Sequence, residues 1–343
     1  MPVHPFDPPR GRVETLTIDS QALRGNLLGD PTVRRVAVYL PEGYDDTDDD
    51  YPLLVDLVGF TGSGLKHLGW QAFTENVPQR LDRLVASGAM GPVIAAFPDC
   101  FTSLGGNQYV NSVATGNWEE FLLDEMIPRI EGAFRVRRGA AHRAVFGKSS
   151  GGYGSIMQAL RHGDRWAAAA CHSGDINFDV IYRRDLPLAT DELARHDGSV
   201  EKFFEHLRGA DKVHSGEMHA LMVLAMAATY DPDPAAPMGV RLPVDLETCE
   251  LDAERWGRWL EHDPLELVDR PECQESLRKL KGLYIDVGAR DQYFCHYGAR
   301  AFSRRLTRAG IAHLFEEFDD NHSSVDYRMD RSLPYLYQAV SAG

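Results

Sequence analysis

The chain has 343 residues, of which 43% are hydrophobic and 25% are charged, a composition typical of globular proteins. The net charge is −15. Binding to nucleic acid or to an anionic membrane surface requires a basic face, so this charge disfavours both kinds of partner. No run of 18 apolar residues is present and the N-terminus lacks the apolar core of a secretory signal, so we expect no membrane span. These features predict a cytoplasmic protein with no nucleic-acid partner, and they leave open whether it forms a homo-oligomer.

The cysteines follow no ligand or disulfide pattern. The chain contains Cys100, Cys171, Cys249, Cys273 and Cys295. They are scattered and odd in number, and no C-x-x-C pair occurs, so the sequence predicts neither a disulfide framework nor a zinc site. The acidic run 45–50 is interpreted as a solvated loop rather than a calcium site, because no glycine-centred calcium-loop spacing follows it.

The first part of the chain alternates strand-like and helix-like runs. Residues 13–18 and 33–40 are β-branched runs around a Gly-Asp-Pro turn, and we expect two antiparallel strands at a sheet edge. Residues 52–58 form a buried strand in this interpretation, and the glycine-rich segment 59–64 then lies at the carboxyl edge, where open α/β folds bind ligands. The other expected elements are a helix over 74–87, a strand over 91–97, a long functional loop over 98–116 and a helix over 118–134.

The second part resumes this alternation after an interruption. We expect strands over 142–146, 166–172, 283–287 and 313–318, and helices over 155–161, 297–309 and 323–340. Between them, residues 176–273 contain helical pieces separated by Pro- and Asp-rich loops. We interpret this segment as a helical cap inserted into the sheet. The chain then divides into a first core part over 1–175, the cap over 176–273 and a second core part over 274–343.

The alternation of strands and helices indicates the fold class. Right-handed crossovers between successive strands produce a mostly parallel central sheet that helices cover on both faces. The sequence therefore predicts an α/β fold of this kind with a helical cap insertion. In such a fold the segments that follow the parallel strands meet at one edge of the sheet, so candidate functional residues are sought there.

The segment Gly147-Lys-Ser-Ser-Gly151 fits the pattern G-x-S-x-G and lies between an expected strand and an expected helix. This context is typical of the nucleophile elbow of α/β-hydrolases, where small residues permit a strained turn that projects the serine. The pattern predicts Ser149 as a nucleophile. A Ser-Lys mechanism through Lys148 is disfavoured, because the elbow points the neighbours of the serine away from it.

An elbow serine needs a base and an acid, and in α/β-hydrolases they follow in the order serine, acid, histidine. Asp291 follows the strand that ends at residue 287, and His322 follows the strand that ends at residue 318. We predict that Asp291 orients His322 and that His322 is the base. The rival carboxylates are Asp286, Asp319 and Asp320. Asp286 is expected to point into a face of the sheet, and closeness in sequence to His322 does not supply the geometry for the other two.

The oxyanion hole of such a site uses two backbone N–H groups. One belongs to the residue after the nucleophile, which is Ser150. The other lies on the loop after the third strand, where we predict Phe60. His172 ends the strand after the elbow, and we interpret it as a buried structural histidine.

Several segments resemble the esterase D-like, or putative esterase, branch of the α/β-hydrolases. They are Tyr39-Leu-Pro-Glu-Gly-Tyr44, Gly105-Gly-Asn-Gln-Tyr-Val-Asn-Ser112, Gly116-Asn-Trp-Glu-Glu-Phe-Leu122, Met126-Ile-Pro-Arg-Ile130 and Gly147-Lys-Ser-Ser-Gly-Gly-Tyr-Gly154. The branch includes S-formylglutathione hydrolases, feruloyl and acetyl-xylan esterases, enterochelin esterases and mycolyltransferases. The resemblance implies an α/β-hydrolase fold and a serine hydrolase that acts on esters without a metal or an organic cofactor.

Two departures from the family bear on specificity. The family often has His-Gly where this chain has Val58-Gly59, and residues 176–273 exceed the compact members. The apolar stretch 220–226 is compatible with an apolar ligand, but we expect most of its side chains to pack the cap onto the core instead. The prediction is a carboxylic ester hydrolase with a small-molecule ester substrate. The alternatives are an acyltransferase that uses the same triad and a non-catalytic binding protein with this fold.

Overall fold

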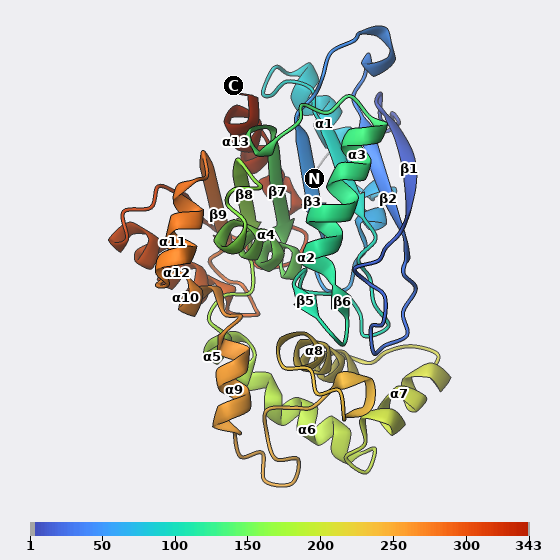
Figure 1. Ribbon diagram of the computed structural model, residues 1–343, viewed down its shortest axis with the longest axis vertical. Helices are drawn as coiled ribbons and strands as arrows, with labels where there is room; N and C mark the ends of the chain where they lie inside the picture. Colours follow the sequence, from blue (N-terminus) through green and yellow to red (C-terminus); the bar gives the residue numbers. More distant parts are fainter. Residues whose placement is uncertain (1–3, 342–343) are drawn as a thin grey trace.

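The computed structural model describes residues 4–341 and contains an eight-stranded sheet in the order β1-β2-β4-β3-β7-β8-β9-β10 (Figure 1). β1 and β2 pair antiparallel at one edge, as predicted, and β2 also runs antiparallel to β4. All the other pairs of this sheet are parallel. The sheet strands are β1 (Arg12–Asp19), β2 (Val33–Leu40), β3 (Leu53–Leu57), β4 (Ile94–Pro98), β7 (Arg143–Lys148), β8 (Ala168–His172), β9 (Gly282–Gly288) and β10 (Leu314–Phe318).

The helices follow the strands in the alternating order predicted. Those associated with the sheet are α1 (Val77–Ala86), α2 (Trp118–Glu120), α3 (Ile127–Ala133), α4 (Ser150–Arg161), α12 (Cys295–Arg308) and α13 (Met329–Ser341). Those between β8 and β9 are α5 (Phe178–Ile181), α6 (Leu186–Ala194), α7 (Val200–Gly209), α8 (Ser215–Tyr230), α9 (Ala253–Leu260), α10 (Pro264–Leu267) and α11 (Pro271–Arg278).

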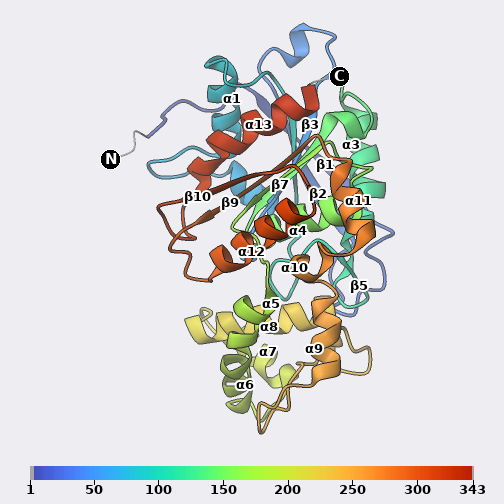
Figure 2. The ribbon, with the colours of Figure 1, turned by 90° about the vertical axis from the view of Figure 1, so that its left-hand side faces the viewer.

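Two hydrophobic clusters cover the two faces of the sheet. Successive residues of β3 alternate between them, since Val55 and Leu57 join one cluster and Leu54 joins the other. The first cluster contains α4 and α12, and the second contains α1 and α13. Figure 2 shows α13 and α1 lying on the side of the sheet away from α4 and α12.

Local capping and turn chemistry explain where elements differ from the expected ranges. α1 begins at Val77 rather than residue 74, because Asn76 and Gln79 form a capping box and Pro78 sits in the first turn. The expected helix over 118–134 divides into α2, a π-helical segment over Phe121–Met126 and α3. The long loop contains a small hairpin of β5 (Asn111–Ser112) and β6 (Gly116–Asn117).

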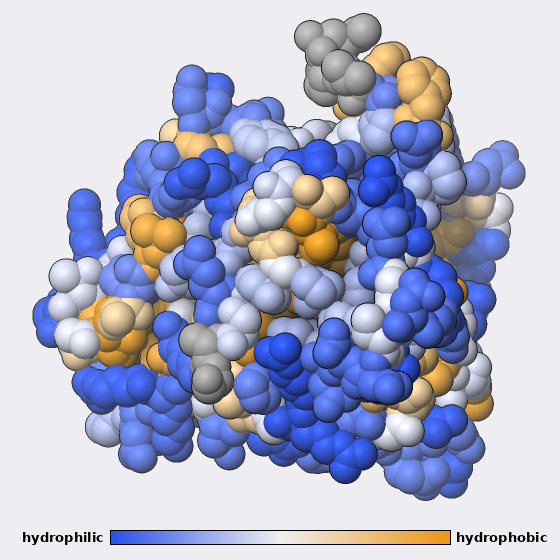
Figure 3. All heavy atoms as spheres, turned by 90° about the horizontal axis from the view of Figure 1, so that it is seen from above, coloured by the Kyte–Doolittle hydropathy of each residue, from blue (hydrophilic) through white to orange (hydrophobic). Residues whose placement is uncertain are grey.

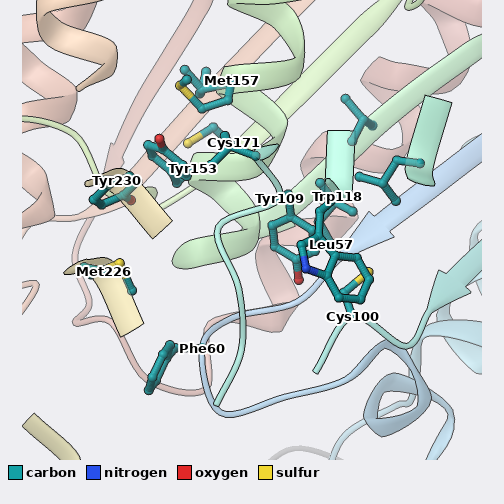
Figure 4. Close-up of a cluster of buried hydrophobic side chains, with 14 of the residues drawn as sticks. Leu57, Phe60, Cys100, Tyr109, Trp118, Tyr153, Met157, Cys171, Met226 and Tyr230 are labelled. Atoms are coloured by element: carbon teal, nitrogen blue, oxygen red, sulfur yellow. The ribbon is translucent and has the colours of Figure 1, made fainter. Parts of the chain in front are cut away.

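Helices α5 to α9 gather beyond the edge of the sheet from which α5 departs after β8 (Figures 1 and 2). Their side chains share the first hydrophobic cluster with the core, for example Phe203 and Leu224 with Trp118 and Tyr153. Figure 4 shows this continuity, since Met226 and Tyr230 of the cap appear in one cluster with Tyr153 and Cys171 of the core. α10 and α11 pack on α4 instead. The division of the chain at residues 176 and 273 stays a prediction.

The end of the molecule farthest from helices α6 to α9 has a largely polar surface (Figure 3). Figure 3 views the end of the molecule opposite the cap, and hydrophilic side chains cover most of that end. Within residues 4–341, each helix is too short or too polar to cross a membrane.

Candidate active site

Ser149 lies at a sharp turn between β7 and α4, as the pattern predicts. Its backbone has φ 58° and ψ −124°, a conformation that costs energy for a residue with a side chain. Glycines make the turn possible, because a Cβ on Gly147 would collide with Gly151 and one on Gly151 would collide with the carbonyl of Leu57. The backbone N–H of Ser149 donates to the carbonyl of His172 (2.9 Å). The serine is thus held, half-buried, at the start of α4.

Asp291 and His322 meet at the same edge. Nδ1 of His322 lies 2.7 Å from Oδ2 of Asp291, and both side chains are buried. Burial alone would raise the pKa of Asp291, but the hydrogen bond and charge of His322 lower it below its usual value. An ionised Asp291 fixes the proton of His322 on Nδ1 and leaves Nε2 as the acceptor. The Ser149 hydroxyl forms no hydrogen bond with any residue in 4–341; such contacts are often longer before substrate binds.

Two residues next to Asp291 position the histidine loop. Gln292 accepts the backbone N–H of His322 (3.0 Å) and donates to the hydroxyl of Ser323 (3.0 Å). The ring of Tyr293 lies edge-on to the imidazole of His322, with ring centroids 4.8 Å apart. The backbone N–H of Tyr293 donates to Oδ1 of Asp291 (2.9 Å). Neither residue is predicted from the sequence, although the position of both directly after Asp291 is a signal.

The rival carboxylates have other partners. Asp286 is fully buried in β9 and binds His172 (2.7 Å) and Arg328 (2.9 Å). Asp319 pairs with Arg290 at the surface, and Asp320 accepts the hydroxyl of Tyr327 (2.9 Å). The structure therefore brings Asp291, and none of these three, to His322.

His172 is the buried, hydrogen-bonded histidine that we expected. Its Nδ1 contacts Asp286, and its Nε2 lies 2.8 Å from the hydroxyl of Ser332. These three side chains form a second serine, histidine and aspartate set, but each is at most 2% exposed. A substrate cannot reach Ser332, so the set braces the sheet against α13.

The glycine-rich loop after β3 approaches the nucleophile. A Cβ on Gly59 would lie 3.3 Å from Cβ and 3.8 Å from Oγ of Ser149. Phe60 follows Gly59, and Ser150 is the first residue of α4. Ser150 and the residue before Phe60 thus lie next to Ser149, and the N-terminal end of α4 adds the positive end of the helix dipole.

The long loop 98–116 packs against this glycine-rich loop after β3. The hydroxyl of Tyr109 donates to the carbonyl of Val58 (2.6 Å), and the N–H of Gly106 donates to the carbonyl of Phe60 (2.6 Å). A Cβ on Gly106 would lie 2.5 Å from that carbonyl oxygen. The loop was expected to be functional from its length, and its contacts explain how it holds Phe60.

The same loop also delivers a polar side chain beside the nucleophile. Nε2 of Gln108 lies 3.1 Å from the hydroxyl of Ser150 and 3.3 Å from that of Tyr182. Asp175, three residues after β8, accepts the hydroxyl of Tyr182 (2.8 Å). The sequence indicates no role for Gln108, Asp175 or Tyr182, because these residues lie far apart in the chain and belong to no common motif.

Asp291 and His322 also belong to a group of potential metal ligands. Sγ of Cys295 lies within 4.8 Å of one ligand atom of each. Burial and, to a smaller extent, the charge of Asp291 raise the pKa of the Cys295 thiol well above its usual value. The raised pKa favours the protonated thiol, whereas metals bind the thiolate. The contact with Asp291 already uses Nδ1 of His322, which favours a paired aspartate and histidine at this position over a set of metal ligands.

A family profile described as "Putative esterase" matches residues 31–330. The chain belongs to this family. Esterase Rv1288 of Mycobacterium tuberculosis (strain ATCC 25618 / H37Rv) is a relative in sequence, 32% identical over 161 residues. The alignment covers 45% of this chain and 31% of Rv1288, so the chain spans less than a third of that esterase.

Solved structures share the fold of this esterase family member. A ferulic acid esterase aligns with a TM-score of 0.62 at 20% identity, covering 96% of this chain and 98% of the other. The fluorophosphonate-binding serine hydrolase FphF of Staphylococcus aureus aligns with a TM-score of 0.57 at 17% identity, covering 96% and 99%. These likenesses confirm the predicted α/β-hydrolase fold.

Proposed function

We propose that the protein hydrolyses carboxylic esters with Ser149 as the nucleophile, His322 as the base and Asp291 as the acid that orients it. The observation that carries the proposal is the 2.7 Å contact between Asp291 and His322 at the sheet edge where Ser149 occupies its strained turn. Membership of the esterase family supports the reaction class.

The reaction follows from the positions of these groups. Oγ of Ser149 attacks the ester carbonyl while Nε2 of His322 takes its proton, and Asp291 stabilises the resulting imidazolium. The N–H groups of Phe60 and Ser150 bind the oxyanion of the tetrahedral intermediate. His322 returns the proton to the departing alcohol, which leaves an acyl group on Ser149. Water then attacks this acyl group while His322 takes its proton, the bond from the acyl carbon to Oγ of Ser149 breaks as His322 returns the proton to Oγ, and the carboxylic acid is released.

The test is removal of the nucleophile. Ser149→Ala should reduce turnover of p-nitrophenyl butyrate to the level without enzyme and abolish labelling by a fluorophosphonate. The exposed Ser103 offers a matched control, and Ser103→Ala should retain both properties. Thermal unfolding should show that both variants are folded. Turnover by a folded Ser149→Ala variant would contradict the proposal.

Two alternatives predict different outcomes. An acyltransferase would give mainly a new ester when an alcohol acceptor is present in water, whereas a hydrolase gives mainly the acid. A non-catalytic binding protein would show no fluorophosphonate labelling. Because a solved neighbour is named a ferulic acid esterase, methyl ferulate belongs in the substrate panel beside short-chain aliphatic esters.

A further inference from the structure

Asp175 lies close to Ser150, the residue after Ser149, and its carboxylate is held through one oxygen. Oδ2 accepts the hydroxyl of Tyr182 (2.8 Å) and lies 3.4 Å from Nε2 of Gln108 and 3.5 Å from the hydroxyl of Ser150. Three donors from three separate segments therefore fix the orientation of this carboxylate. Ser150 directly follows Ser149 in the chain, so the carboxylate of Asp175 contacts the residue next to the proposed nucleophile.

The other oxygen of Asp175 remains available to a ligand. Within residues 4–341, Oδ1 accepts no hydrogen bond and no basic side chain forms an ion pair with Asp175, while the side chain is only partly buried. Gln108 is fully buried, and its Oε1 has no partner among the described residues. Buried polar groups are normally paired, so the unpaired Oε1 of Gln108 indicates a missing hydrogen-bond donor, and Oδ1 of the partly exposed Asp175 offers a second acceptor beside it.

Asp175 also lies within the electrostatic reach of the triad. Burial raises the pKa of Asp175 above its usual value, although the hydrogen bond of Tyr182 and the charge of His322 oppose this rise. Aromatic and thioether side chains surround the donors of Asp175, since the hydroxyls of Tyr182 and Tyr230 lie 3.5 Å apart and Sδ of Met226 lies 2.8 Å from Nε2 of Gln108. A carboxylate in such surroundings attracts hydroxyl and ammonium groups and repels carboxylates.

We propose that Asp175 is a specificity residue whose Oδ1 binds a hydroxyl or ammonium group of the substrate close to the scissile ester. The inference rests on the proposed function and narrows its substrate class to polar esters that carry a hydrogen-bond donor or a cation. It places the recognition of this group at the junction of β8 and the loop 98–116, next to the base of the cap.

The experiment compares matched esters with the wild-type chain and with Asp175→Asn. In the first pair, propyl butyrate and 2-hydroxyethyl butyrate, a hydroxyl replaces the terminal methyl of the alcohol. In the second pair, methyl butyrate and methyl 3-hydroxybutyrate, a hydroxyl replaces a hydrogen of the acyl group. Butyrylcholine supplies the cation. Hydrolysis is followed in a pH-stat, and fluorophosphonate titration gives the concentration of active sites.

We expect wild-type kcat/KM to favour at least one polar ester over its apolar match by about 10-fold or more, as a hydrogen bond to a charged group allows. Asp175→Asn should reduce that ratio to about threefold or less, because its amide can turn a donor toward the substrate. Tyr182→Phe, which frees the carboxylate without removing it, should reduce the ratio by a smaller factor. Comparison of hydroxyl esters with butyrylcholine identifies which group binds.

Two results would overturn the inference alone. One is a wild-type ratio near one for every pair, and the other is an equal ratio in wild type and Asp175→Asn while both are labelled by the fluorophosphonate. Failure of the proposed function has a different signature, because the wild-type chain would then hydrolyse no ester and take up no label. That result would remove the inference as well.

Discussion

Substitution of Gly106 by alanine tests the oxyanion loop without touching any catalytic side chain. A Cβ at residue 106 would lie 2.5 Å from the carbonyl oxygen of Phe60 and 2.8 Å from its Cα. Reaching an ordinary contact of 3.4 Å from 2.5 Å requires a displacement of about 0.9 Å. A displacement of about 1 Å in a catalytic group costs on the order of 100-fold in rate, and loss of an oxyanion donor costs roughly 100- to 1,000-fold.

We therefore expect Gly106→Ala to lower kcat for p-nitrophenyl butyrate by about 100-fold, with a smaller change in KM, because the N–H of Phe60 acts mainly on the oxyanion. Gly132 in α3 provides the control, since a Cβ there meets no atom within 4 Å. Gly132→Ala should leave kcat unchanged and stabilise the helix by up to about 1 kcal/mol. A folded Gly106→Ala variant with kcat within about threefold of wild type would refute the role given to Phe60.

Two further predictions concern the acid and a buried histidine. Asp291→Asn should lower kcat by roughly 10,000-fold, because the imidazole of His322 then takes the wrong tautomer. Asp319→Asn at the surface is the control and should have little effect on kcat in the same assay. Similar losses in both variants would contradict the role given to Asp291. Burial and the charge of Arg161 lower the pKa of His262 to about 4. The unfolded chain, with the ordinary value of 6.5, takes up a proton that the folded chain does not, so stability falls as the pH drops from 6.5 toward 4. Between pH 7 and 5, urea unfolding of wild type should lose about 2 kcal/mol more than His262→Gln, and parallel losses would show that His262 does not titrate in this way.

The sequence predicts the groups whose signals are local. The glycines around Ser149 predict the turn, because only small residues fit where that turn contacts β3. Asp291 and His322 could be found because parallel strands bring their carboxyl ends to one edge. The choice of Asp291 over Asp319 followed from strand order, and the 2.7 Å contact with His322 agrees with it.

The groups that depend on distant loops were not predictable in the same way. Gln108 reaches Ser150 only because the loop 98–116 folds against the segment after β3, held there by Tyr109 and Gly106. Neither Gln108 nor Asp175 belongs to a pattern that names its partner. The π-helical segment over Phe121–Met126 has an apolar periodicity that a continuous α-helix would also satisfy, so its change of hydrogen bonding was not visible in the sequence.

The pairing of β8 with β9 has a consequence for how the molecule assembles. These neighbours in the sheet are separated in the chain by the entire segment 173–281, so their contact must wait for that segment to be synthesised. Asp291 and His322 lie beyond it. During synthesis the elbow and its serine therefore emerge well before the acid and the base. If the proposed roles hold, a nascent chain that stops before β9 carries Ser149 without the pair that activates it, and we expect no ester hydrolysis until the last parallel strands join the sheet.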